Sequence, residues 1–137
     1  MEVVILYETL VDLHLLADSI QAKKKEVGGY LLGQKLVKTY LVQKIMVVPE
    51  EQLFSPATFI LTEAQSKLEI LGIFSFGRET GIKKKMKQPL FCEKIALFIR
   101  KEKKAGFKIS SSLLRFDRRF YFARPDRLLL EVEGGNA

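Results

Sequence analysis

The sequence predicts a single domain over residues 1–137, with a mixed α+β (α/β) fold in which helices flank a central, mostly antiparallel sheet. Two observations support this prediction. A length of 137 residues is that of one domain and is enough to bury a normal hydrophobic core. Short apolar runs alternate with segments of helical periodicity in the order β-α-β-β-α-β-α-β-β-β, which is typical of helices that cover a sheet.

The first part of the chain is expected to form a strand, a helix and a pair of strands. Residues 3–6 are an apolar run that predicts a strand. Thr9 is expected to cap the following helix, because apolar residues recur behind it at helical spacing up to the lysines at 23–25. The polar segment QKLVKT then joins two predicted strands over residues 30–33 and 40–48.

The middle of the chain predicts a second helix and the most basic loop. A short strand is expected over 59–61, and the capping box TEAQ at 62–65 predicts a helix that ends near Gly72. Residues 73–76 then predict a strand, and the glycine-containing segment 77–89 is expected to be a basic loop.

The last part of the chain predicts a third helix and three strands. After Pro89 the apolar residues recur at helical spacing, and Gly106 suits the end of a helix. The apolar face of this helix would consist of Phe91, Ile95, Phe98 and Ile99. The closing strands are expected over residues 109–116, 120–123 and 127–132.

The composition limits the chemistry that the chain can perform. His14 is the only histidine and Cys92 the only cysteine, so an internal disulfide and a Cys/His zinc site are excluded. His14 falls between the core positions of the first helix, where we expect it to be partly exposed. The sequence shows neither a signal peptide nor an apolar run that could cross a membrane, so we expect a cytoplasmic protein without a membrane partner.

The positive charge is concentrated in one segment. Residues 82–104 contain nine cations and two acids, and this excess equals the net charge of +7 of the whole chain. A localised excess of cations favours an anionic partner such as nucleic acid, although a solvated surface explains it as well. The nine cations are Lys83, Lys84, Lys85, Lys87, Lys94, Arg100, Lys101, Lys103 and Lys104.

One segment resembles a known family. Directly after the first predicted helix, EVGGYLLG at residues 26–33 has the pattern Glu-x-x-Gly-x-Leu-x-Gly, which resembles the JAB/MPN family. Residues 71–73 and the order of the elements are similar to that family over nearly the whole chain. The resemblance implies a JAB/MPN-like domain. Active members are zinc isopeptidases with a His-x-His pair on the strand equivalent to 73–76, and a Ser and an Asp further on.

The residues at the implied zinc positions differ from those of active members. The degenerate positions are Glu26, Phe74, Ser75, Phe76, Leu90 and Glu93. Phe74 and Phe76 stand where the family has its two histidines, and phenyl rings have no lone pair for zinc. Both rings are expected on one face of the strand, where they would fill the volume of the metal and its ligands. Only Glu26 matches an active member.

The positions of the family's Ser and Asp allow two alignments. One places them at Leu90 and Glu93 and needs extra residues in the preceding loop. The other needs no insertion and places them at Lys84 and Lys87. Neither alignment completes a zinc site, so the resemblance implies a member without metal, cofactor or isopeptidase activity.

The sequence therefore predicts a non-enzymatic domain that acts as a protein-interaction or scaffold module, with a protein partner or a second copy of itself. An alternative hypothesis is a nucleic-acid-binding module that uses the basic residues of 82–104. A third hypothesis is a hydrolase with a different site, for which the only candidates are Glu26 and Ser75.

Overall fold

The computed structural model describes residues 1–23, 27–102 and 106–131. The elements follow one another in the order β1 (Glu2–Ile5), α1 (Tyr7–Lys23), β2 (Gly28–Lys35), β3 (Thr39–Val47), α2 (Glu50–Leu53), α3 (Pro56–Ser66), β4 (Glu69–Ser75), α4 (Glu79–Met86), the 3-10 turn η1 (Pro89–Phe91), β5 (Ile95–Glu102), β6 (Gly106–Asp117), β7 (Arg119–Ala123) and β8 (Arg127–Leu130).

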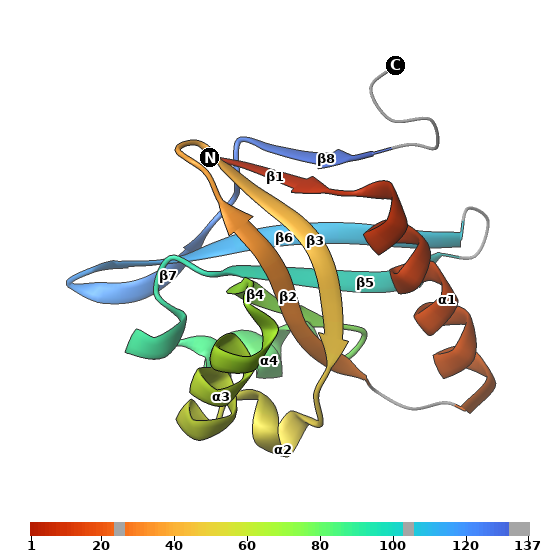
Figure 1. The fold of residues 1–137 in the computed structure, drawn as a ribbon, viewed down its shortest axis with the longest axis horizontal. Helices are drawn as coiled ribbons and strands as arrows, with labels where there is room; N and C mark the ends of the chain where they lie inside the picture. The colour runs from red at the N-terminus through yellow and green to blue at the C-terminus, as the bar shows by residue number, and fades with distance from the viewer. Residues whose placement is uncertain (24–26, 103–105, 132–137) are drawn as a thin grey trace.

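All eight strands belong to one mixed sheet, in the order β7-β6-β5-β4-β2-β3-β1-β8. β1 runs parallel to both β3 and β8, and β4 runs parallel to β5, whereas the other neighbours are antiparallel. The sheet is strongly twisted and curled, so that β2 and β3 cross the direction of β5 and β6 (Figure 1). Helix α1 lies on one side of the sheet, and α2, α3 and α4 lie together on the other (Figure 1).

The sheet therefore has a hydrophobic core on each face. On the side of α1, Leu13 packs with Phe74 and Leu97. On the side of α2–α4, Tyr30 packs with Met86 and other buried residues. Because successive side chains of a strand point to opposite faces, the central strands β4 and β5 contribute to both cores.

The predicted third helix is wrong, because this segment forms η1 and strand β5. The five consecutive residues from Ile95 to Ile99 are all buried. A continuous apolar run suits a strand that is covered on both faces, whereas a helix of this kind would leave one side in water. The helical spacing of Ile95, Phe98 and Ile99 follows from that unbroken run, and Phe91 lies before it in η1. Gly106 begins β6 with a φ of 82° and does not end a helix.

The predicted beginnings of two helices are also wrong. Helix α3 begins at Pro56 and absorbs the strand expected over 59–61, and the cap is Ser55, whose side chain accepts a hydrogen bond from the Thr58 amide at 3.4 Å. Thr62 lies within this helix, so the apparent capping box caps nothing. Thr9 lies within α1, where its hydroxyl donates to the carbonyl of Val42 at 3.5 Å.

The basic loop expected over 77–89 is corrected to a helix. Residues 79–86 form α4, and Ile82 and Met86 are both buried beneath it. These two apolar residues are four apart, so they lie on one face of the helix and anchor it to the sheet. The lysines between them obscured this pair in the sequence.

The predicted fold class, a JAB/MPN-like α+β domain with a sheet flanked by helices, is wrong. The structure is dominated by its eight-stranded, curled mixed sheet and has few helices. The individual strands expected over 3–6, 30–33, 40–48 and 73–76 are confirmed, as are the three closing strands. The prediction is wrong for two reasons. The spacing of residues 91–99 predicts a helix where the structure has a strand that is buried on both faces, and more strands than expected join one sheet.

A close approach between backbones fixes the centre of the sheet. A Cβ atom on Gly72 of β4 would lie 1.8 Å from the carbonyl oxygen of Ile95 on β5. No larger residue fits there without moving one of the two central strands. Gly81 on α4 is the opposite case, since a Cβ atom there would meet nothing within 4 Å.

We predict that Gly72→Ala lowers the free energy of unfolding by about 2 kcal/mol or more, because an added methyl group overpacks the core. Gly81→Ala is the matched control and should be neutral or stabilising by up to about 1 kcal/mol, because alanine favours a helix. Urea unfolding of the two variants checks both values. Equal stability of the two variants would contradict the assigned close approach of β4 and β5.

Candidate functional site

Three strand ends meet on the side of α2 and α4. The amide of Phe76 donates to the carbonyl of Val27 at 2.9 Å, which joins the end of β4 to the start of β2. The amide of Val48 donates to the carbonyl of Gly28 at 3.0 Å, which joins the end of β3 to the same point. The chain leaves the sheet after each of these bonds and continues into α2 or α4, so a hollow is left between the two helices.

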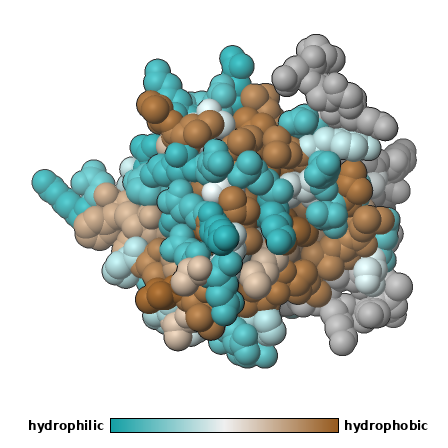
Figure 2. Space-filling model, viewed as in Figure 1, coloured by the Kyte–Doolittle hydropathy of each residue, from teal (hydrophilic) through white to brown (hydrophobic). Residues whose placement is uncertain are grey.

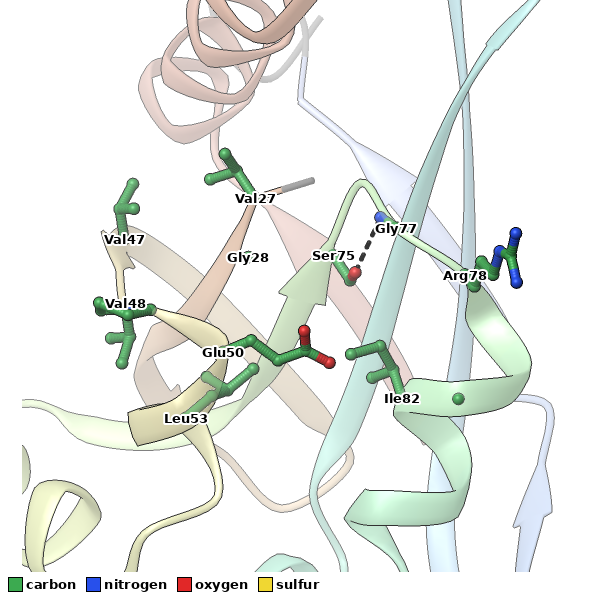
Figure 3. Close-up of a pocket in the computed structure, with 12 residues that line it drawn as sticks. Val27, Gly28, Val47, Val48, Glu50, Leu53, Ser75, Gly77, Arg78 and Ile82 are labelled. Carbon is green, nitrogen blue, oxygen red and sulfur yellow. Dashed lines mark hydrogen bonds between the residues drawn. The ribbon is translucent and has the colours of Figure 1, made fainter. Parts of the chain in front are cut away.

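This hollow is a pocket of about 300 Å³ (Figure 3). Its walls come from β2, β3, β4, α2 and α4 and are mainly apolar. The lining residues are Val27, Gly28, Val47, Val48, Pro49, Glu50, Leu53, Ser75, Gly77, Arg78, Gly81 and Ile82. Its size and lining are those of the smaller ligand or side-chain sites found in proteins.

Three polar side chains border the pocket (Figure 3). Ser75 is 4% exposed, and its Oγ accepts a hydrogen bond from the amide of Gly77 at 2.9 Å. The carboxylate of Glu50 accepts from Lys85 Nζ at 2.9 Å. Arg78 is exposed at the start of α4. The Glu50 carboxylate points towards Ser75 and Ile82, whereas the Arg78 guanidinium is directed away from the pocket (Figure 3). The pocket thus combines an apolar interior with a buried hydroxyl and a carboxylate.

The polar groups of the pocket do not form a nucleophile with its base. A serine nucleophile needs a general base within hydrogen-bond reach, and in the described part of the chain the only hydrogen bond to the Ser75 side chain comes from a backbone amide. His14 is exposed on α1, as predicted, and lies edge-to-face with Phe107 at 5.8 Å, on the opposite side of the sheet.

The structure separates the predicted degenerate site from the pocket. Phe74 is fully buried in the core on the α1 side, and its ring meets the ring of Phe76 edge-to-face at 6.1 Å. The prediction that the two rings share a face is therefore confirmed. The residue between them, Ser75, points to the opposite face and is the one that reaches the pocket.

The remaining residues of the predicted site are scattered. Leu90 is partly buried and packs against the core on the α2–α4 side. Glu93 has a φ of 63°, and its carbonyl accepts a hydrogen bond from the hydroxyl of Tyr40. Burial raises the pKa of Tyr40, and the charge of Lys35 opposes this rise. Glu26 lies outside the described residues.

The predicted basic face is partly neutralised. Three of its lysines form ion pairs, from Lys83 to Glu79 at 2.8 Å, from Lys85 to Glu50 at 2.9 Å and from Lys94 to Glu69 at 3.6 Å. Three further cations are exposed, namely Lys84, Lys87 and Arg100. Lys103 and Lys104 lie outside the described residues, as does the side chain of Lys101.

Sequence reasoning missed most of the pocket. Val48 follows β3, Leu53 ends α2 and Ile82 lies in α4, and the three have no common pattern in the sequence. The available signals were Pro49, which ends a predicted strand, and the glycines at 77 and 81, which frame α4 and the pocket border. Within the described ranges, no group of three or more His, Cys, Asp or Glu residues gathers as a metal site would need.

Comparisons with known proteins inform on the fold. No protein-family model and no curated protein matches the chain. Among solved structures, the chain is similar to the solution structure of protein DSY2949 from Desulfitobacterium hafniense, a structural-genomics target, with a TM-score of 0.62. That match covers 96% of this chain and 94% of the other at 14% sequence identity. At this identity the likeness shows a shared fold alone. In the described segments no helix is both long and apolar enough to span a membrane.

One wall of the pocket depends on a buried tyrosine. The hydroxyl of Tyr30 on β2 donates to the carbonyl of Leu53 at 2.8 Å, and Leu53 lines the pocket. Burial raises the pKa of Tyr30 to about 12. A phenol whose folded pKa lies above the unfolded value of about 10 stabilises the fold fully below pH 10, and this stabilisation is lost as the pH rises to about 12.

We predict that the free energy of unfolding of the wild type falls between pH 10 and pH 12 by about 3 kcal/mol more than that of Tyr30→Phe, which has no phenol to ionise. At pH 7, Tyr30→Phe should be less stable by about 1–3 kcal/mol, because the Leu53 carbonyl loses its donor. Chemical unfolding over this pH range measures both effects. Tyr121→Phe, at a side chain that is 40% exposed, should behave like the wild type.

We predict that Phe74→His destabilises the protein by more than about 2 kcal/mol, because it places a polar ring in a fully apolar core. Phe76→His should have a smaller effect, because Phe76 is only partly buried. Thermal and urea unfolding compare the two variants. An unchanged stability of Phe74→His would mean that this ring does not occupy the core between the sheet and α1.

Proposed function

We propose that the chain is a non-catalytic protein-interaction module and that its binding site is the pocket between α2 and α4. The observation that carries this proposal is an apolar cavity of about 300 Å³ whose polar border groups do not form a catalytic pair. A cavity of this size accommodates one or two apolar side chains of a partner protein. Ser75 offers a hydroxyl proton at the wall, and the Glu50 carboxylate, which points into the pocket, favours a partner with a hydrogen-bond donor beside the apolar anchor.

The surface around the pocket supports this proposal. Val47 lines the pocket and is 53% exposed. An exposed apolar side chain at the mouth of a concave site is typical of surfaces that a protein partner covers. The resemblance to the JAB/MPN family remains a prediction, and the proposal does not depend on it.

The other two hypotheses are less well supported. Nucleic-acid binding through residues 82–104 is weakened because Lys83, Lys85 and Lys94 are ion-paired, which leaves Lys84, Lys87 and Arg100 as its exposed cations in the described part. A hydrolase with a different site requires a base that accepts the proton of Ser75, whereas the hydrogen bond found at this side chain is one that Ser75 Oγ accepts from the amide of Gly77. Both remain predictions that biochemical assays can test.

We predict that Gly81→Leu blocks binding at the pocket. Position 81 borders the cavity and has free space for a side chain, so a leucine can fill the mouth without a clash. Peptides are first selected from a displayed random library for binding to the wild type. These peptides should bind Gly81→Leu at least about 10-fold more weakly than the wild type, since one apolar anchor contributes at least about 1.4 kcal/mol. Fluorescence polarisation measures these affinities.

Thr80→Leu is the matched control, because it adds the same side chain to the same helical turn outside the pocket. It should bind the selected peptides like the wild type. Equal binding to Gly81→Leu would place the interaction elsewhere. If no peptide is selected, sedimentation decides whether the partner is a second copy: a dimer that Gly81→Leu dissociates supports the proposal, and a monomeric wild type contradicts it.

A further inference from the structure

The β6–β7 hairpin extends beyond the sheet. β6 pairs with β5 from Gly106 to Leu113, and Leu114 exchanges backbone hydrogen bonds with Lys94 at 2.9 Å and Glu93 at 2.8 Å, just before β5. From Arg115 to Asp117, β6 continues with β7 as its neighbour in the sheet. The result is a two-stranded ribbon that projects from one end of the molecule (Figure 1). We call residues 114–123 the β6–β7 ribbon.

The ribbon and its flank are strongly cationic. Arg115, Arg118, Arg119 and Arg124 are all exposed, and the only acid among residues 114–124 is Asp117. Within the described chain no carboxylate forms an ion pair with any of these four guanidinium groups, whereas Lys83, Lys85 and Lys94 on the body are paired. Arg115 lies near enough to Asp126 for their charges to interact. The ribbon therefore offers Arg118 and Arg119 as exposed cations on an element that is accessible from several directions.

The same ribbon exposes aromatic rings. Phe116 is 56% exposed and Tyr121 is 40% exposed. Phe116 lies opposite Phe120, with their ring centroids 5.0 Å apart, and Arg115 lies opposite Tyr121. One face of the ribbon thus presents a pair of phenylalanines, and the other presents an arginine beside a tyrosine. In Figure 2 the projection shows this mixture as a hydrophilic end next to paler, more apolar atoms.

Cross-strand aromatic pairing stabilises a hairpin, but it does not explain the free guanidinium groups. The face of the ribbon that carries Phe116 and Phe120 continues towards the rest of the sheet. There Lys83 Nζ lies 5.3 Å from the ring centroid of Phe122 and 5.7 Å from that of Phe98. The rings near the body are therefore covered by a cation of this chain. The ring of Phe116, further out, is the one left to a partner.

We propose that the β6–β7 ribbon binds single-stranded nucleic acid. Exposed rings stack on bases without regard to sequence, and guanidinium groups contact phosphates in pairs of hydrogen bonds and stack as well. Four arginines and no lysine between residues 114 and 124 favour a partner with planar groups and phosphates over a merely acidic surface. This proposal is independent of the pocket, which lies between α2 and α4.

The test measures the affinity of the whole chain for fluorescently labelled dT20 and U20, for a 20-base-pair duplex and for vesicles that contain phosphatidylserine, at several salt concentrations. We expect dT20 or U20 to bind more tightly than the duplex and the vesicles. The double variant Arg118→Ala, Arg119→Ala should weaken this binding at least about 10-fold. It should also reduce the salt slope, which is the slope of the logarithm of affinity against the logarithm of salt concentration, by the amount that about two phosphate contacts contribute. Phe116→Ala should weaken it about 5-fold or more without changing the salt slope.

Two controls separate the ribbon from general charge and from folding. Lys38→Ala with Lys44→Ala removes the same charge from exposed positions outside the ribbon and should change the affinity by less than about 2-fold. Phe116→Tyr keeps a ring and should restore the binding that Phe116→Ala loses. Equal losses in both double variants, a preference for duplex or vesicles, or no binding at low salt would each overturn the proposal.

Discussion

The packing of β4 against β5 at the centre of the sheet is the constraint on which the rest of the structure depends. Both strands are buried on both faces, and Gly72 allows the backbone of β5 to approach without a side chain between them. Because each strand supplies residues to two cores, α1 and the group α2–α4 are held by the same pair of strands. A disturbance at this contact would reach both faces of the protein.

The pocket follows from this arrangement. β4 ends at Ser75, where hydrogen bonds from Phe76 and Val48 bring the ends of three strands together. The alternation of side chains places Phe74 in the core and Ser75 in the pocket. The two phenylalanines at the implied zinc positions therefore do not fill the pocket: they support it from the other side of the sheet.

The two proposed binding surfaces have different physical characters. The pocket is a small apolar cavity whose border charges are partly paired, which suits an apolar anchor of a protein. The ribbon is a projecting two-stranded element with free arginines and exposed rings, which suits an extended anionic chain. The basic segment 82–104, which carries the net charge in the sequence, supplies Lys83 to the base of the ribbon by way of α4.

The sequence alone determined the strands with clear apolar patterns, the first helix, the exposure of His14 and the shared face of Phe74 and Phe76. These features depend on local periodicity, which is visible within a few residues. Only the tertiary structure decided that residues 95–102 are a strand, that α4 is a helix and that Val48, Leu53 and Ile82 meet around Ser75. A continuous apolar run fits a buried strand or a buried helix equally well, and contacts between distant segments decide which one forms.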